Sequence, residues 1–280
     1  MSQTHIPFQI EIPHKGTLSG WALENGGAPQ GVALLHGLGD HAGRYHHVGA
    51  ALAARGLAVQ ALDLPGHGLS YGRRGHIGSW QEYRDSVTAW MDRARSEHPE
   101  RRWALFGQSM GAIVALDWAF ERPERVRTLV LAAPPFELAF NPSIVKIRAA
   151  QILMRIWPGF TQDNMILPSV LSHDPAIVRA HSADPLVHHR ISARLFIELQ
   201  RARASVGRRA SELRHDALIL HGGDDHVASV LGSERWASSA PAGRTTLRLY
   251  PGLYHEVLNE IGRDAIIASM VDWIAGQMER

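Results

Sequence analysis

A serine flanked by glycines lies in residues 107–111, which read Gly-Gln-Ser-Met-Gly after a short apolar run and before a run typical of a helix. A serine held in a tight turn between a strand and a helix exposes its hydroxyl, and only glycine tolerates the crowding on either side. The hydroxyl is a weak nucleophile by itself and needs a neighbouring base to remove its proton. The motif predicts Ser109 as a nucleophile, and the alternative is a glycine-rich turn with an incidental serine.

Candidate partners for this serine follow two later apolar runs that are typical of strands. Asp224 and Asp225 come directly after the run at 217–222, and His255 follows the run at 245–251. The order serine, acid, histidine is the chain order of α/β-hydrolases, in which the acid orients the histidine and the histidine deprotonates the serine. The order alone leaves both aspartates open as the acid.

A glycine-rich turn after another apolar run offers donors for the negative charge that develops on an attacked carbonyl group. Residues 34–45 read "LLHGLGDHAGRY", and such a turn can aim a backbone N–H outward. Together with the N–H that follows the nucleophile, this predicts an oxyanion hole formed by the N–H groups of Leu38 and Met110. A plain glycine loop is the alternative.

The elements that must position these residues are short apolar runs alternating with helix-length segments. The runs lie at 8–12, 31–36, 57–63, 102–107 and 126–134, and the helical segments lie at about 44–55, 79–98 and 110–122. Buried strands that alternate with helices indicate an α/β protein with a mostly parallel sheet covered on both faces. Ligands bind beyond the carboxyl ends of such strands, where Ser109 falls.

The alternation breaks after residue 135 and resumes near residue 214. The intervening segment reads as helices separated by prolines, without a convincing strand, and the chain closes with a helix near 263–278. We therefore expect a core domain formed by residues 1–135 and 214–280, with residues 136–213 inserted as a helical cap.

The composition is that of an ordinary globular protein and excludes several classes. The chain has 29 basic and 27 acidic residues and no contiguous basic block, so we expect no nucleic-acid partner. The absence of cysteine excludes disulfides and thiol chemistry. No segment has the features of a secretory signal or the ~18 uncharged apolar residues of a membrane span, so we expect a cytoplasmic protein and leave peripheral contact with membranes open.

From residue 31 to its C-terminus, the chain resembles the monoacylglycerol lipase and lysophospholipase branch of the α/β-hydrolases. The matching motifs are "HGLGDHAGRY", "LDLPGHGLSYG", "GQSMG", "NPSIVKIRAAQIL", "SADPLV", "HGGDDHV" and "YHEVLNE". The resemblance implies Ser109 as nucleophile, Asp225 as acid, His255 as base, and Leu38 and Met110 as the oxyanion donors. It also implies that no metal or cofactor takes part.

The sequence departs from the family pattern at two places. The elbow usually reads GHSMGG, whereas this chain has Gln108 and Ala112, which are conservative changes. Monoacylglycerol lipases of the vertebrate type have a second histidine three residues after the catalytic one, and this chain has Leu258 there. The resemblance therefore implies weak selectivity for a glycerol headgroup.

Substrate contacts are expected from the cap and from the oxyanion loop. The segment 142–160 is apolar around nearly its whole circumference, and we expect Ile152, Ile156 and Trp157 to line an acyl pocket. The alternatives are ordinary packing on the main domain and contact with lipid aggregates, with the arginines near headgroups.

Near the oxyanion loop, Asp40 and Arg44 are candidates for binding a polar headgroup, and a solvated helix start is the alternative. The expected function is a serine hydrolase that cleaves single-chain lipid esters. A small-ester carboxylesterase or thioesterase, and a ligand-binding receptor that retains the site, remain the rivals. The sequence leaves the oligomeric state open.

Overall fold

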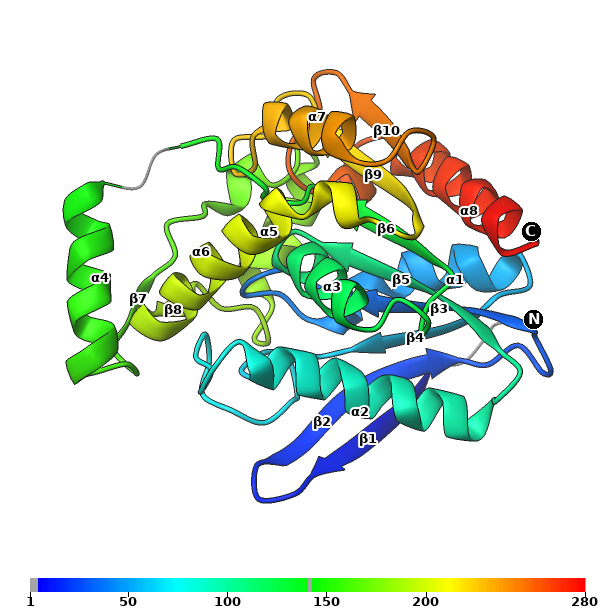
Figure 1. The fold of residues 1–280 in the computed structure, drawn as a ribbon, viewed down its shortest axis with the longest axis horizontal. Coiled ribbons are helices and arrows are strands. Elements are labelled where there is room, and N and C mark those ends of the chain that lie inside the picture. The colour runs from blue at the N-terminus through cyan, green and yellow to red at the C-terminus, as the bar shows by residue number, and fades with distance from the viewer. Residues whose placement is uncertain (1–4, 141–142, 280) are drawn as a thin grey trace.

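The structure is a computed structural model that describes residues 5–140 and 143–279. Its centre is an eight-stranded sheet with the strand order β1-β2-β4-β3-β5-β6-β9-β10 (Figure 1). The strands are β1 (Ile6–Ile12), β2 (Gly16–Leu23), β3 (Gln30–Leu35), β4 (Ala58–Leu62), β5 (Arg102–Gln108), β6 (Thr128–Ala132), β9 (Asp216–Gly222) and β10 (Thr245–Tyr250). β2 pairs antiparallel with β1 and β4, and the other neighbours pair in parallel, which confirms the mostly parallel sheet.

β2 is the strand of this sheet that the apolar pattern did not predict. Its sequence contains Gly16, Ser19 and Gly20, which interrupt the apolar run. Gly20 is required by packing, because a Cβ there would lie 2.3 Å from the Ala61 carbonyl oxygen and 2.4 Å from the ring of Phe8. Because its neighbours approach so closely, β2 has glycine at a position where an apolar side chain would have indicated a strand.

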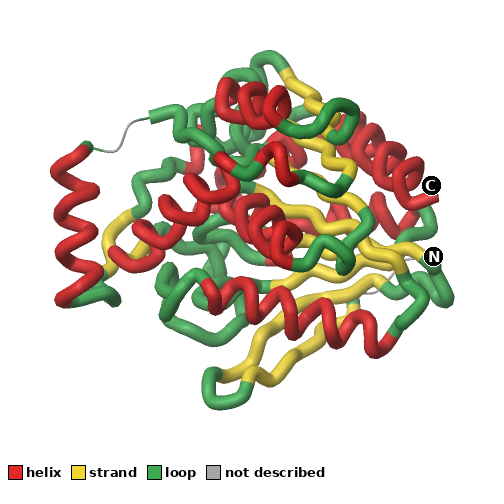
Figure 2. Tube along the Cα trace, viewed as in Figure 1, coloured by secondary structure: helices red, strands yellow, loops and turns green. Residues whose placement is uncertain are grey.

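Helices cover both faces of the sheet, as Figure 2 shows. The helices on one face are α2 (Gln81–Glu97), α3 (Met110–Glu121) and α7 (Val230–Ser239), and those on the other are α1 (His46–Ala54) and α8 (Arg263–Glu279). The central strands are buried on both sides, so they read as continuous apolar runs rather than alternating ones. Within the described residues, no helix is both long and apolar enough to span a membrane.

The chain leaves the sheet between β6 and β9. The elements of this segment are α4 (Ile144–Ile156), β7 (Thr161–Asp163), α5 (Pro175–Ala183), β8 (Arg190–Ser192) and α6 (Ala193–Arg208). β7 and β8 pair antiparallel, so the expectation that the segment holds no strand is wrong. Strands of three residues are too short to give an alternating pattern. Figure 1 shows α4 standing away from the body of the molecule, and α4 packs against α6.

Candidate active site

Ser109 lies in the turn between β5 and α3, beyond the carboxyl end of a central strand. Its backbone has φ 52° and ψ −118°, a conformation that residues with a side chain rarely adopt. The Ser109 N–H donates to the carbonyl oxygen of Ala132, on the neighbouring strand β6, at 2.9 Å. Strain at an otherwise regular junction is typical of functional positions, and it persists only where the surroundings hold it.

The two glycines of the turn are required by contacts with backbone atoms. A Cβ on Gly107 would lie 2.3 Å from the Gly111 carbonyl oxygen, and a Cβ on Gly111 would lie 2.4 Å from that of His36. Backbone atoms of strands and helices cannot move aside without disturbing their hydrogen bonds. The sterics of the strand–turn–helix junction therefore explain the glycine spacing around the serine.

Asp225 and His255 form a buried pair, with His255 Nδ1 2.7 Å from Asp225 Oδ2. Burial alone would lower the pKa of His255, but the charge of Asp225 and this hydrogen bond outweigh it, so the pKa of His255 lies above its ordinary value. Burial would raise the pKa of Asp225, but the charge and hydrogen bonds of its histidine neighbours outweigh it and lower that pKa. An ionised Asp225 keeps the proton of neutral His255 on Nδ1, which leaves Nε2 free to act as a base.

The geometry favours Asp225 over Asp224 as the acid. Asp225 Oδ1 accepts hydrogen bonds from the N–H groups of Val227 and Ala228 at 2.7 and 2.9 Å, so the carboxylate cannot rotate freely. Asp224 is exposed to solvent. A buried, hydrogen-bonded carboxylate can orient a histidine, whereas an exposed one is screened by water.

The proposed oxyanion donors, Leu38 and Met110, line the same cavity as Ser109. Met110 is the first residue of α3, so its N–H is one of those that a helix leaves without a partner inside the helix. Leu38 precedes Gly39, which has φ 77° and whose carbonyl oxygen accepts from the His188 N–H at 2.9 Å. The oxyanion loop is therefore held directly by the segment between β6 and β9.

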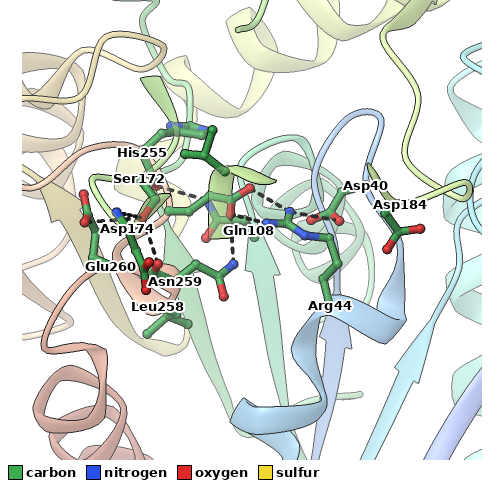
Figure 3. Close-up of polar contacts among 12 residues, drawn as sticks. Asp40, Arg44, Gln108, Ser172, Asp174, Asp184, His255, Leu258, Asn259 and Glu260 are labelled. Carbon is green, nitrogen blue, oxygen red and sulfur yellow. Dashed lines mark hydrogen bonds and ion pairs between the residues drawn. The ribbon is translucent and has the colours of Figure 1, made fainter. Parts of the chain in front are cut away.

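Asp40 and Arg44 belong to a buried network of ion pairs. Arg44 lies in a 3₁₀ helix (Ala42–Tyr45) and donates two hydrogen bonds to Glu256, at 2.9 and 2.7 Å. It also lies 3.2 Å from Asp40, and dashed lines mark the contacts of Arg44 in Figure 3. Asp40 and Glu256 line a cavity beside Ser109, but Arg44 is not among the described residues around it. This differs from the headgroup contact expected for Arg44, whose donors already engage the two carboxylates.

Two small cavities meet at Ser109, and we call them the apolar and the polar cavity, because hydrogen-bonding side chains are more numerous around the second. The residues that line only the apolar cavity are Met110, Pro135, Leu138, Phe140, Ile191, Phe196, Leu199, Gln200, Arg203 and Val227. The residues that line only the polar cavity are Gly37, Asp40, Gln108, Leu171, His181, His188, His189, His255 and Glu256. Their volumes are about 90 and about 30 Å³, whereas pockets for small molecules usually measure ~300–1,000 Å³.

The cap residues expected in the acyl pocket lie elsewhere. Ile152, Ile156 and Trp157 are 60%, 75% and 60% exposed and line neither cavity. The segment reads as apolar around nearly its whole circumference, but α4 packs mainly against α6 among the described residues, so much of its surface faces solvent. The apolar cavity is instead lined by α6, through Phe196 and Leu199.

Several residues of the site were missed because they have no signal in the sequence until the fold is known. His181 lines the polar cavity and is almost fully buried, and its Nδ1 has no hydrogen-bond partner among the described residues. Glu260 accepts from the N–H groups of Tyr254 and His173 at 2.9 and 3.0 Å and so joins the His255 loop to the segment between β6 and β9. Leu258 is buried in the core and lines neither cavity.

A family model described as serine aminopeptidase, S33, matches residues 28–262, and the chain belongs to this hydrolase family. In sequence, it is 34% identical to the monoacylglycerol lipase of Mycolicibacterium smegmatis, over 89% of this chain and 90% of that protein. It is 28% identical to phospholipase YtpA of Bacillus subtilis, over 84% and 91% of the two chains.

In structure, the chain is similar to the monoacylglycerol lipase of Paleococcus ferrophilus, with a TM-score of 0.83, 27% identity and coverage of 98% and 99% of the two chains. Together with the family match, these similarities confirm the α/β-hydrolase fold and the monoacylglycerol lipase branch indicated by the sequence motifs.

Proposed function

We propose that this protein is a serine hydrolase that cleaves carboxylic esters of single-chain lipids through an acyl-enzyme on Ser109. The observation that carries the proposal is the buried Asp225–His255 pair, because its histidine lines the cavity that contains Ser109, a strained and partly exposed serine. The names of the relatives support the ester-hydrolase class, since one is a monoacylglycerol lipase and another a phospholipase.

The proposed reaction has two halves. His255 Nε2 removes the proton of Ser109 as the hydroxyl oxygen attacks the ester carbonyl carbon, and the N–H groups of Leu38 and Met110 stabilise the oxyanion. Protonated His255 then gives its proton to the leaving alcohol, and the acyl group remains on Ser109. A water molecule, deprotonated by His255, then attacks the acyl carbon. The bond to Ser109 Oγ breaks, His255 returns the proton to Oγ, and the fatty acid leaves.

The two cavities support separate binding of the acyl chain and the alcohol half of the substrate. The apolar cavity fits an acyl chain, because Leu138, Phe196 and Leu199 offer only hydrocarbon to its occupant. The polar cavity fits the alcohol half, because Asp40 and His181 offer hydrogen-bonding groups. Since Leu258 lies outside this cavity, we expect alcohol recognition to rest on the cap histidines and to be broad.

We further propose that residues 136–213 act as a cap that opens to admit the chain. The cavity of about 90 Å³ beside Ser109 is smaller than the ~300–1,000 Å³ of typical ligand pockets, so a long acyl chain requires movement. The exposed apolar side chains of α4, together with exposed Arg148 and Arg155, fit contact with a lipid surface. This accounts for the exposure of Ile152, Ile156 and Trp157.

Hydrolysis of p-nitrophenyl esters of increasing chain length tests the proposed function, with a monoacylglycerol and a lysophospholipid alongside. Each buried methylene contributes up to ~0.8 kcal/mol, so two extra carbons should raise kcat/KM by up to about tenfold until the cavity is full. A rate that is highest on acetate and falls steadily with chain length would favour a small-ester carboxylesterase. No turnover on any ester would favour a receptor.

The role of α4 needs a separate test, because it concerns the lipid surface and not the chemistry. Ile156→Glu should lower the hydrolysis of monoacylglycerol in vesicles while leaving p-nitrophenyl butyrate in solution unchanged. Leu249→Glu on β10 is a matched control, since Leu249 is also exposed but lies on the sheet edge. Equal loss with both substrates in Ile156→Glu would mean that α4 acts through the fold instead.

A further inference from the structure

A second histidine, His221, lies against the carboxylate that holds the proposed base. His221 is the penultimate residue of β9 and its side chain is completely buried. Its Nε2 lies 3.2 Å from Asp225 Oδ2, the same oxygen that His255 Nδ1 approaches at 2.7 Å. The reaction described above uses Asp225 and His255 but gives no role to this buried histidine.

The surroundings of the His221 ring determine where its proton lies. Nε2 faces two acceptors, Asp225 Oδ2 and the Ala228 carbonyl oxygen, both at 3.2 Å. A nitrogen that faces only acceptors must carry a hydrogen. Nδ1 lies 2.8 Å from the hydroxyl of Ser233, on α7, which can donate to it. The ring is therefore satisfied as a neutral histidine with its one proton on Nε2.

Four hydrogen-bond donors surround the carboxylate of Asp225, two at each oxygen. Oδ1 accepts from the N–H groups of Val227 and Ala228, and Oδ2 accepts from His255 and faces the Nε2–H of His221. Each donor stabilises the charged carboxylate and so weakens its attraction for the proton on His255. Of these donors, His221 is the one that a side-chain substitution can remove without touching the catalytic residues.

We propose that His221 is a positioning residue of the hydrolase, which fixes Asp225 and limits how strongly that carboxylate holds the proton of His255. The inference rests on the proposed function. A carboxylate with one donor fewer would bind the Nδ1–H of His255 more tightly. His255 would then keep its second proton up to a higher pH, and less of the enzyme would have a free base at neutral pH.

The other charged groups near the pair are few. Glu256, next to His255, also raises the pKa of His255, and its carboxylate is bound by Arg44. Asp40 lies on the far side of Arg44. His181, from the cap, lines the polar cavity together with His255. None of these groups contacts Asp225 among the described residues, so substitution of His221 leaves their arrangement unchanged.

Substitution of His221 by either of two amide residues distinguishes the proposed role from simple packing. In His221→Gln, the amide nitrogen reaches the position of Nε2 and can still donate to Asp225. In His221→Asn, the shorter side chain reaches only the position of Nδ1, so the donor is lost. His215→Gln is a control, since His215 is also buried and its Nε2 donates to the Pro123 carbonyl oxygen, away from both cavities.

The experiment measures kcat/KM against pH for p-nitrophenyl butyrate, with active enzyme counted by fluorophosphonate labelling. We expect His221→Asn to move the acidic limb upward by about one pH unit and to leave KM unchanged, because His221 does not line either cavity. His221→Gln should restore the limb to within a few tenths of a unit of the wild type, and His215→Gln should not move it.

An unmoved limb in His221→Asn, or an equal shift in His221→Gln, overturns the inference. If neither His221 variant folds, Ser233→Ala decides, since it keeps the ring but removes the hydroxyl that holds the ring in place. A smaller upward shift of the limb then supports the inference, and no shift contradicts it. A wild-type enzyme without ester turnover would contradict the proposed function itself, which distinguishes the two failures.

Discussion

The side-chain amide of Gln108 donates a hydrogen bond to the backbone carbonyl oxygen of His255 at 3.2 Å. Gln108 precedes the nucleophile on β5, and His255 lies 147 residues later in the loop after β10. Both residues are buried, so the bond is shielded from water. Gln108 therefore holds the loop that carries His255, the proposed base. The family pattern has histidine at this position, and the change to glutamine keeps a hydrogen-bond donor there.

Removal of the nucleophile gives the most direct prediction. Ser109→Ala should abolish labelling by a fluorophosphonate and lower kcat by about 10⁶-fold, as loss of the nucleophile does in other triads. Mass spectrometry of the labelled wild-type protein should locate the adduct on Ser109. Full esterase activity in the variant would exclude the whole mechanism.

The two adjacent aspartates form a matched pair of substitutions. Asp225→Asn should slow turnover by up to ~10⁴-fold with the fold intact, because an amide no longer enforces the right tautomer of His255. Asp224→Asn should have little effect, since Asp224 is exposed. Rates measured with active-site titration check this, and reversed effects would show that Asp224 is the acid.

The pH dependence follows from the raised pKa of His255. The base must be neutral, so kcat/KM should rise as pH increases through this pKa, which lies above the ordinary value of 6.5. Asp225→Asn removes the charge that raises the pKa, and its limb should therefore move to lower pH. A profile of the wild type that is flat from about pH 5 to 9, with chemistry rate-limiting, would argue against a histidine base.

The Arg44 network should contribute to stability more than to substrate binding. Arg44→Met leaves buried Asp40 and Glu256 without their cation, which should cost about 3 kcal/mol of unfolding free energy. Urea denaturation followed by circular dichroism measures this change. If Arg44→Met left the stability unchanged but raised KM strongly, Arg44 would instead bind the headgroup of the substrate.

The apolar cavity has a polar section formed by Gln200 and Arg203 of α6, which hydrogen-bond to each other. Arg203 is half-buried, and this burial lowers the pKa of its guanidinium. Arg203→Met should extend the hydrocarbon lining and raise kcat/KM for octanoate relative to butyrate esters several-fold, at up to ~0.8 kcal/mol per buried methylene. Arg201→Met is the control, because the side chain of Arg201 is 62% exposed. An equal ratio of octanoate to butyrate kcat/KM in the two variants would mean that the acyl chain does not pass Arg203.

The parts of the molecule that could be predicted are those in which local sequence sets local geometry. The buried strands read as apolar runs, and the Gly-x-Ser-x-Gly motif is typical of a tight strand–helix turn, so most of the sheet and the strained turn at Ser109 could be predicted. The position of α4 could not be predicted, because an apolar segment reads the same whether it packs in a core or faces solvent. The contacts of Gln108 with the His255 loop and of His221 with Asp225 were missed, because each depends on how a loop folds back after a strand, which the apolar pattern does not record.

In the proposed mechanism, the positive φ of Ser109 places a requirement of catalysis and a cost in stability at the same residue. A side chain in that conformation costs on the order of 1–3 kcal/mol, which the packing of β5 and α3 around it must offset. Glycine would adopt the same backbone without strain, so the sequence that folds most favourably at position 109 is one that cannot react. The enzyme therefore retains a local weakness in its fold for the sake of its chemistry, and any selection for greater stability has to act elsewhere in the chain.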